Sequence, residues 1–198
     1  PAEANDAASE RPVEQETQKR PVSVLDARRV ALNALADVNR VDAYAALALD
    51  KRLREAKLSG EDRRLATSIF YAAVENRLNI QYVLKDFMKT KPEPVVEDIL
   101  HIACAQILFM DRIPVHAAVD EAVKQTRAFG REEAAGFVNG VLRSLLRAIE
   151  ADEIHYPDTE TEPIAYLSVK YSVPEKIVQR LIDAYGFETA AEIVSFRP

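Results

Sequence analysis

Hydrophobic residues recur along the chain at spacings of three and four positions. In segment 24–40, one such face comprises Val24, Ala27, Ala31, Leu35 and Val38. Polar side chains, among them Arg29, Asn33 and Asp37, fall on the opposite side. Because this is the period of an α-helix with one buried face, the segment is predicted to be an amphipathic helix.

The same pattern predicts further helices and no strand. Their expected ranges are about 43–56, 60–88, 94–110, 114–129, 132–150, 163–171, 174–185 and 187–196. Proline disrupts a helix interior, so Pro92 and Pro94 separate two of these helices, and Gly130 is placed to end another in a left-handed conformation. No segment alternates with the two-residue period of a strand, so the predicted fold class is all-α.

One predicted helix contains the sequence ILHIACAQILFM, which is apolar on nearly all sides. A helix of this kind is expected at the centre of a bundle. It carries the single cysteine, Cys104, which has no basic residue nearby to lower its pKa and is therefore interpreted as a buried structural thiol.

Candidate catalytic and metal-binding groups are few. His101, His116 and His155 lack the i, i+4 spacing of a helical zinc pair, so no metal ligand is expected. Neither a phosphate-binding glycine-rich loop nor a G-x-S-x-G elbow occurs in the sequence. The chain is therefore expected to be non-catalytic as it stands, with no bound cofactor of its own.

Charge is distributed unevenly along a chain whose net charge is −6. Residues 23–150 contain 18 acidic and 19 basic side chains, whereas 1–22 and 151–198 are both acidic. An indiscriminate polyanion binder is thus disfavoured, because phosphate neutralisation needs a local excess of Lys and Arg. A clustered minority of arginines could still form a basic face, and an ordinary solvated surface is the alternative.

The N-terminal residues 1–22 are polar and acidic, unlike a secretory signal, and are interpreted as a disordered leader. No apolar run reaches the roughly 18 residues of a membrane span. With one cysteine and no disulfide framework, a cytoplasmic location is expected, without a membrane partner.

The helix predicted at 132–150 contains FVNGVLRSLLRAIE, with Asn139 and Gly140 adjacent in its middle. Gly costs a helix interior roughly 1 kcal/mol relative to Ala, and Asn is a mediocre helix former. A tertiary role must offset that cost.

Two adjacent motifs, IPVHAAVDEAVK and GFVNGVLR, resemble the all-helical NusB-like domain, in particular the N-terminal domain of the bacterial 16S rRNA cytosine-5 methyltransferases of the Sun/Fmu family. DRRLATSIFYAAVENRL and ARRVALNAL extend the resemblance over about 25–150. It implies a NusB-like helical bundle that binds RNA over 23–150, followed by a small helical linker subdomain over 151–198.

On this resemblance, Gly136 and Gly140 would let a neighbouring helix approach closely, and Asn139 would bury its amide and hydrogen-bond a connecting loop. Arg28 and Arg29 fall on the first helix, where NusB-like domains place part of their RNA contact. Arg143 follows Asn139 by one turn and could contact RNA phosphate or pair locally with an acidic residue. Arg28, Arg29 and Arg143 are the candidate RNA-binding residues.

The helices near 163–198 resemble the linker that leads into the catalytic domain of the methyltransferases. The chain is therefore expected to be the non-catalytic, RNA-recognising N-terminal domain of an enzyme that methylates 16S rRNA. Cytosine-5 methylation needs a nucleophilic cysteine, a base and S-adenosylmethionine, all expected from the full-length protein's own C-terminal methyltransferase domain. A free-standing NusB-type transcription antitermination factor and a helical protein-interaction module remain the alternatives.

Overall fold

The computed structural model describes residues 23–41 and 43–196, and the described part contains helices and connecting loops but no strand. The predicted leader at 1–22 lies outside the described residues. The helices are α1 (Ser23–Val41), α2 (Ala45–Glu55), α3 (Gly60–Glu75), α4 (Arg77–Lys85), α5 (Pro94–Phe109), α6 (Val115–Ala128), the short 3-10 helix η1 (Glu132–Ala134), α7 (Ala135–Glu150), α8 (Pro163–Tyr171), α9 (Glu175–Tyr185) and α10 (Phe187–Ser195). The predicted all-α class is confirmed.

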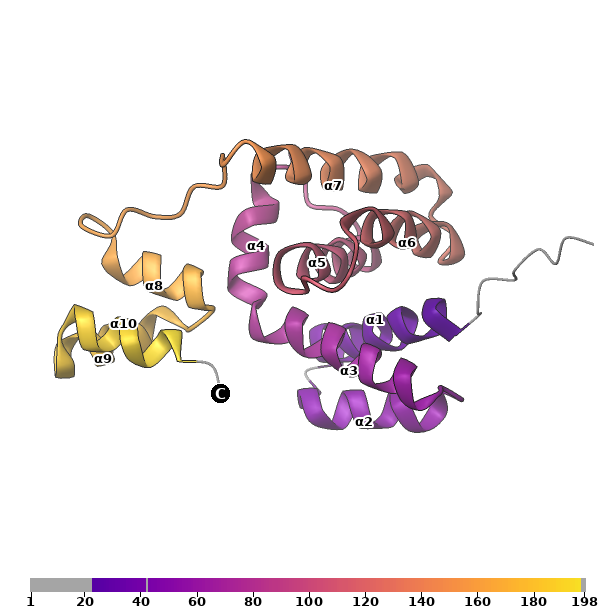
Figure 1. Cartoon of the computed structure of the whole chain (residues 1–198), viewed down its shortest axis with the longest axis horizontal. Coiled ribbons are helices and arrows are strands. Elements are labelled where there is room, and N and C mark those ends of the chain that lie inside the picture. Colours follow the sequence, from indigo (N-terminus) through magenta and orange to yellow (C-terminus); the bar gives the residue numbers. More distant parts are fainter. Residues whose placement is uncertain (1–22, 42, 197–198) are drawn as a thin grey trace, which may run out of the picture.

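Helix α5 forms the centre of the main bundle, as its apolar sequence predicted. It is surrounded by α1, α3, α4, α6 and α7 in Figure 1, and its buried stretch runs without interruption from Asp98 to Gln106. The main hydrophobic cluster includes Leu35, Phe70, Leu100 and Leu142, contributed by four different helices. Burial of this apolar surface is the main stabilising contribution to the bundle.

The single helix predicted at 60–88 is instead two helices, and that part of the prediction is wrong. Asn76 ends α3 with φ −107° and ψ 23°, and α4 starts at the next residue in a different direction (Figure 1). The side-chain amide of Asn76 donates to the Ala72 carbonyl oxygen at 2.9 Å. Asparagine competes for backbone hydrogen bonds in this way, so it tolerates a break that hydrophobic spacing alone does not reveal.

Local features stabilise two other helix ends, and the left-handed end predicted at Gly130 is confirmed. The Ser59 hydroxyl accepts a hydrogen bond from the Asp62 backbone N–H at 3.1 Å, which caps the start of α3. Gly130 follows α6 with φ +70°, the left-handed conformation that glycine adopts without a steric cost.

The C-terminal helices form a second, smaller hydrophobic cluster. Its buried residues are Leu167, Val178, Ala190 and Val194. Helices α8, α9 and α10 lie to one side of the main bundle in Figure 1, and α8 contacts α4. The functional boundary drawn near residue 150 stays a prediction. Within the described residues, no helix is both long and apolar enough to cross a bilayer.

Candidate functional site

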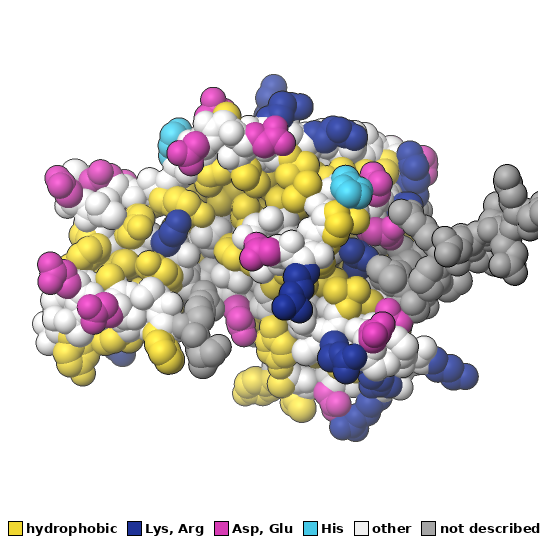
Figure 2. Space-filling view, viewed as in Figure 1, with side chains coloured by type: hydrophobic (Ala, Val, Ile, Leu, Met, Phe, Trp, Pro, Cys, Tyr) yellow, Lys and Arg dark blue, Asp and Glu magenta, His cyan; other side chains and the backbone are white. Residues whose placement is uncertain are grey.

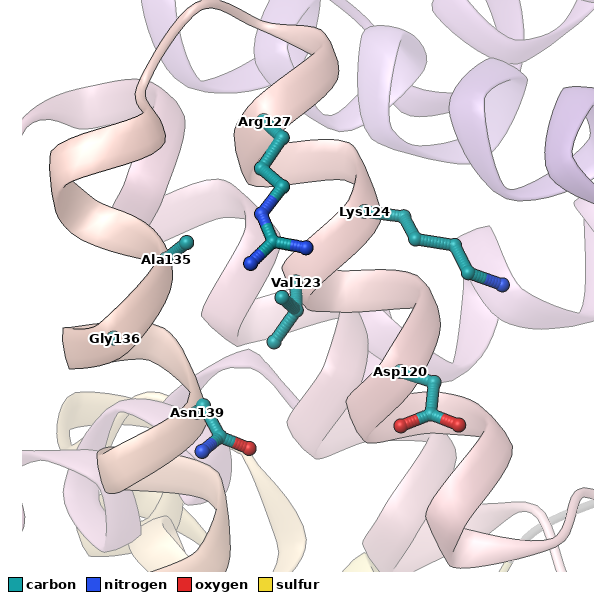
Figure 3. Close-up of a pocket in the computed structure, with 7 residues that line it drawn as sticks. All are labelled: Asp120, Val123, Lys124, Arg127, Ala135, Gly136 and Asn139. Atoms are coloured by element: carbon teal, nitrogen blue, oxygen red, sulfur yellow. The ribbon is translucent and has the colours of Figure 1, made fainter.

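The motifs that carry the resemblance fold into two antiparallel neighbours, α6 and α7, with a groove between them. The groove has a volume of about 290 Å³ and is lined by Asp120, Val123, Lys124, Arg127, Ala135, Gly136 and Asn139. In Figure 3, Arg127 and Asn139 reach into the groove from opposite sides, whereas Lys124 extends away from α7. The space-filling view shows basic side chains along the α7 edge of the molecule, with carboxylates among them (Figure 2).

Gly136 and Gly140 do not mediate a close helix contact, so the packing role predicted for them is wrong. Both residues are exposed, and a Cβ built at either position would meet nothing within 4 Å. The four-residue spacing does put them on one face of α7, but that face is turned to solvent. Gly136 therefore leaves the backbone of α7 open at the groove, and Gly140 leaves it open to solvent one turn further on.

Asn139 is half-buried, and its predicted hydrogen bond to a connecting loop is also wrong. Its Oδ1 atom accepts a hydrogen bond from Arg143 Nε, one turn further along the same helix, at 3.0 Å. This contact holds the guanidinium group of Arg143 against the helix surface. The partner is a neutral amide, so Arg143 keeps its full positive charge for an external anion.

Positive charge continues along the exposed face of α7. Arg147 follows Arg143 by four residues, is exposed, and donates through Nη2 to the Ser144 hydroxyl at 2.8 Å. Among the described residues, neither arginine forms an ion pair with a carboxylate. Along the exposed face of α7, Gly136 and Gly140 are therefore followed by Arg143 and Arg147.

The groove cations on α6 are partly neutralised. Lys124 Nζ lies 2.7 Å from Glu121 Oε1, and Arg127 Nε lies 3.0 Å from Glu132 Oε1. The Arg127–Glu132 pair is largely solvent-exposed, where ion pairs contribute little and exchange readily, whereas the Glu121 side chain of the other pair is only 15% exposed. Neither cation was among the predicted site residues. Their i, i+3 spacing, which puts both cations on one exposed helix face, is the sequence signal that could have identified them.

Arg28 is not a surface residue, and its prediction as an RNA contact is wrong. It is 5% exposed, and its Nε atom donates to Gln106 Oε1 of α5 at 2.8 Å. Burial lowers the pKa of Arg28, and the nearby Glu121 carboxylate opposes that shift. A guanidinium held inside the bundle is inaccessible to a phosphate group.

Arg29, the next residue, is exposed and stays a candidate. Its guanidinium carbon lies 4.8 Å from the centroid of the Phe129 ring, at the end of α6. Arg143 is held by Asn139 on α7 instead, so the two exposed arginines belong to different elements. Because Arg28 is buried, the three predicted arginines do not form one exposed cluster.

Cys104 and His101 are both buried in α5. The burial of Cys104 agrees with its interpretation as a structural thiol. Burial raises the pKa of Cys104, which disfavours the thiolate. Burial also lowers the pKa of His101 to about 4, and its Nε2 atom lies 3.0 Å from the Ala73 carbonyl oxygen. No group of metal-ligating side chains occurs in the described part of the chain.

Comparisons with known proteins agree with this arrangement. "Probable ribosomal RNA small subunit methyltransferase B" of Bacillus subtilis (strain 168) is 34% identical over 168 residues, which cover 84% of this chain and 37% of the relative. "Transcription antitermination protein NusB" of Heliobacterium modesticaldum is 33% identical over 128 residues, covering 62% of this chain and 61% of that protein. The chain spans little more than a third of the length of the methyltransferase relative.

Solved structures share the fold. The "Crystal Structure of Antitermination Factors NusB and NusE in complex with dsRNA" matches with a TM-score of 0.59 at 19% identity, covering 63% of this chain and 96% of that chain. The "Crystal Structure of PH0851" matches with a TM-score of 0.65 at 18% identity, covering 88% of this chain and 39% of that one.

The model of the NusB family matches residues 25–147, which make up more than half of the chain. The two motifs of α6 and α7 lie within that range, and the predicted resemblance is confirmed. The chain belongs to the NusB family.

Proposed function

We propose that this chain is the RNA-recognising, non-catalytic N-terminal part of a 16S rRNA cytosine-5 methyltransferase. The observation that carries the proposal is the length of the match to methyltransferase B, 168 residues against 128 for the antitermination protein. The family model ends at residue 147, so the methyltransferase match includes chain outside the family domain. Helices α8 to α10 supply a folded segment of suitable length after that domain.

The α6–α7 groove and the exposed face of α7 are the proposed RNA contact. Phosphate groups are bound by Lys and Arg and by approachable backbone, and base contacts then add specificity. Arg143 and Arg147 have no carboxylate partner in the described part of the chain, while Gly136 and Gly140 let a ligand approach the helix backbone. An external ligand of this kind would offset the helix cost of the two glycines.

The residues of this chain also fit a non-catalytic role. A cysteine nucleophile must be accessible and easily deprotonated, whereas Cys104 is fully buried and its pKa is raised. The nucleophile, the base and the site for S-adenosylmethionine would then belong to the methyltransferase domain of the full-length protein. That cofactor would supply the methyl group there.

The RNA contact can be tested by titrating a labelled 16S rRNA fragment with the wild-type chain and with the double variant Arg143→Gln, Arg147→Gln. Each lost phosphate contact reduces the slope of log affinity against log salt by about 0.7–0.9, so the variant should bind roughly tenfold more weakly with a flatter salt dependence. The matched control is Arg63→Gln, Arg64→Gln, which removes the same charge from exposed positions on α3.

Circular dichroism should show the same helical signal for all three proteins. If the wild-type chain fails to bind RNA at low salt, the proposal is wrong and the protein-interaction module is favoured. If the α7 variant and the control behave alike, the α6–α7 surface is not the RNA contact.

The antitermination alternative has a separate test. The crystal structure with TM-score 0.59 contains NusB together with NusE. Size-exclusion chromatography of this chain mixed with NusE should give no stable complex if the chain is part of a methyltransferase. Co-elution would favour the antitermination function.

A further inference from the structure

A second groove runs beside α4, on elements that the α6–α7 contact does not use. One part has a volume of about 390 Å³ and is lined by Lys85, Lys89 and Lys91 together with Leu84 and Met88. An adjoining part of about 270 Å³ adds Arg40 and Arg77. Gln81, Lys91, Glu97 and His101 line both parts, which makes them one continuous groove, the α4 groove.

The α4 groove is strongly cationic in a chain whose net charge is −6. Its lining holds five basic side chains, Arg40, Arg77, Lys85, Lys89 and Lys91, against two carboxylates, Glu97 and Asp98. By contrast, the lining of the α6–α7 groove holds two cations and one carboxylate. Local excess of positive charge is what a polyanion requires, whatever the net charge of the whole protein.

The two carboxylates of the groove are already engaged by groove residues. Glu97 lies 3.3 Å from Lys91 Nζ, and Asp98 lies 2.7 Å from Arg40 Nη2. Asp98 also accepts a hydrogen bond from the Asn39 amide at 2.7 Å. For Lys85 and Lys89, the described part of the chain offers no carboxylate within ion-pair distance. These two lysines carry uncompensated charge.

The cations follow the axis of α4. Arg77, Gln81 and Lys85 are all exposed and spaced four residues apart, so they form a stripe roughly 12 Å long at the helical rise of 1.5 Å per residue. Lys89 and Lys91 continue beyond the end of the helix. A linear arrangement of this kind suits an extended polyanion better than a single small anion.

The floor of the groove offers hydrogen-bonding groups suited to ribose. His101 is buried, and with Nε2 donating to the Ala73 carbonyl oxygen, Nδ1 is left as the acceptor of its neutral ring. Gln81 adds an exposed amide with both donors and an acceptor. A ribose 2′-hydroxyl group can pair with either side chain.

Nearby aromatic rings already have cation and ring partners, which favours recognition of the backbone over recognition of bases. Lys85 Nζ lies 4.1 Å from the centroid of the Tyr82 ring, and Tyr82 stacks on Tyr156 with the ring planes 11° apart. Lys170 Nζ of α8 lies 4.3 Å from the centroid of the Tyr156 ring. A base would have to compete with these contacts for the two rings, and Lys170 extends the basic surface onto α8.

We infer that the α4 groove binds the phosphodiester backbone of an RNA strand as a second contact, separate from the α6–α7 surface. Lys85, Lys89 and Lys91 bind phosphate groups, and Gln81 and His101 lie beneath the sugars. The inference rests on the RNA-binding function proposed above. It adds a sequence-independent contact on the side of the bundle that adjoins the C-terminal helices.

The test is a salt titration of a fluorescein-labelled single-stranded RNA of about 15 nucleotides, comparable to the larger single-strand site sizes, with the full chain. Lys85→Gln, Lys89→Gln, Lys91→Gln should weaken binding at least about tenfold and reduce the salt slope by about 2, at 0.7 for each lost single-strand contact. The matched control Lys51→Gln, Lys57→Gln, Lys176→Gln removes the same charge from exposed positions outside both grooves and should change the slope much less.

A second measurement locates the RNA directly. In the wild-type chain, RNA should shift the NMR signals of the Gln81 side-chain amide and the His101 ring, which line only the α4 groove. If the wild type does not bind RNA, both proposals fail. If it binds and the α7 variant is impaired, but the groove variant matches its control and those signals do not move, only the α4 groove inference is overturned.

An acidic protein segment is the competing occupant. Binding of labelled poly-glutamate that the groove variant loses, with RNA affinity at the level of the charge-matched control, would overturn the inference in favour of a protein partner.

Discussion

At the residue scale, His101 couples the stability of the bundle to pH. Its pKa falls from 6.5 to about 4 because burial disfavours the charged ring. In the unfolded chain the same ring takes up a proton below about pH 6.5. The unfolded state therefore binds more protons between these two values, and stability falls as the pH falls through that window.

We expect the free energy of unfolding to decrease between pH 7 and pH 4 by about 3 kcal/mol on account of His101, at 1.36 kcal/mol per pKa unit. His101→Gln should remove this part of the decrease, because a glutamine amide can still donate to the Ala73 carbonyl and does not titrate. Urea unfolding at a series of pH values measures the difference. Burial raises the pKa of Asp98, so this residue makes stability increase as the pH falls. Because Asp98 is present in both the wild type and His101→Gln, its contribution largely cancels in their difference.

His155→Gln is the matched control, since this histidine is exposed. Parallel pH profiles for the wild type and His101→Gln would contradict the prediction.

Some side chains are buried or exposed because of hydrogen-bond partners far away in the sequence, and the sequence alone does not predict these partners. Arg28 and Arg29 are adjacent and chemically identical, yet one is buried and the other exposed. Successive residues of a helix point about 100° apart, so helical period separates the two, but it does not identify which polar residue will be buried. The partner that stabilises Arg28 is Gln106, 78 positions away, and only the fold brings the two together.

At the element scale, α7 carries a glycine cost that its own packing does not explain. The spacing of Gly136 and Gly140 predicts close helix packing, and the open space around both residues removes that explanation. The helix itself and its approximate bounds followed from hydrophobic spacing, and the structure shows that its buried face includes Val138, Leu142 and Leu145. Spacing of small residues does not reveal which side of a helix meets a neighbour.

Gly140→Ala should therefore stabilise the protein, by about 0.5–1 kcal/mol in the free energy of unfolding. Alanine is a better helix former and restricts the unfolded chain more than glycine. Thermal and urea denaturation measure the change. Gly130→Ala is the informative control, because Gly130 has φ +70° and a side chain there is strained, so that variant should lose stability.

A destabilised Gly140→Ala would mean that another helix approaches α7 in solution.

At the scale of the whole molecule, α4 joins the main bundle to the C-terminal helices. The Asn79 backbone N–H donates to the Ser172 hydroxyl at 3.0 Å, and its side-chain amide donates to the Tyr156 hydroxyl at 3.1 Å. Tyr156 also stacks on Tyr82. Hydrophobic spacing predicts the C-terminal helices, but this junction depends on polar residues that do not recur with a helical period, so it was not predicted.

The final prediction is that Tyr156→Ala loosens α8, α9 and α10 without unfolding the main bundle. The small cluster around Leu167 and Val178 has few buried residues, so the contact with α4 is expected to supply much of its stability. Removing the ring deletes the hydrogen bond to Asn79, the stack on Tyr82 and the contact with Lys170. We expect amide hydrogen exchange in the C-terminal helices to become roughly tenfold faster, which corresponds to about 1.4 kcal/mol.

Amides of α5 should keep their wild-type protection, because the main core excludes Tyr156. Tyr44→Ala provides the matched loss of an exposed tyrosine far from this junction and should leave both regions unchanged. If α5 and α8 lost protection together, the chain would unfold as one cooperative unit and the C-terminal helices would not be separable from the bundle. An independent response of α8 to α10 would instead mean that the α4 junction sets how firmly the NusB-family domain holds the segment that follows it.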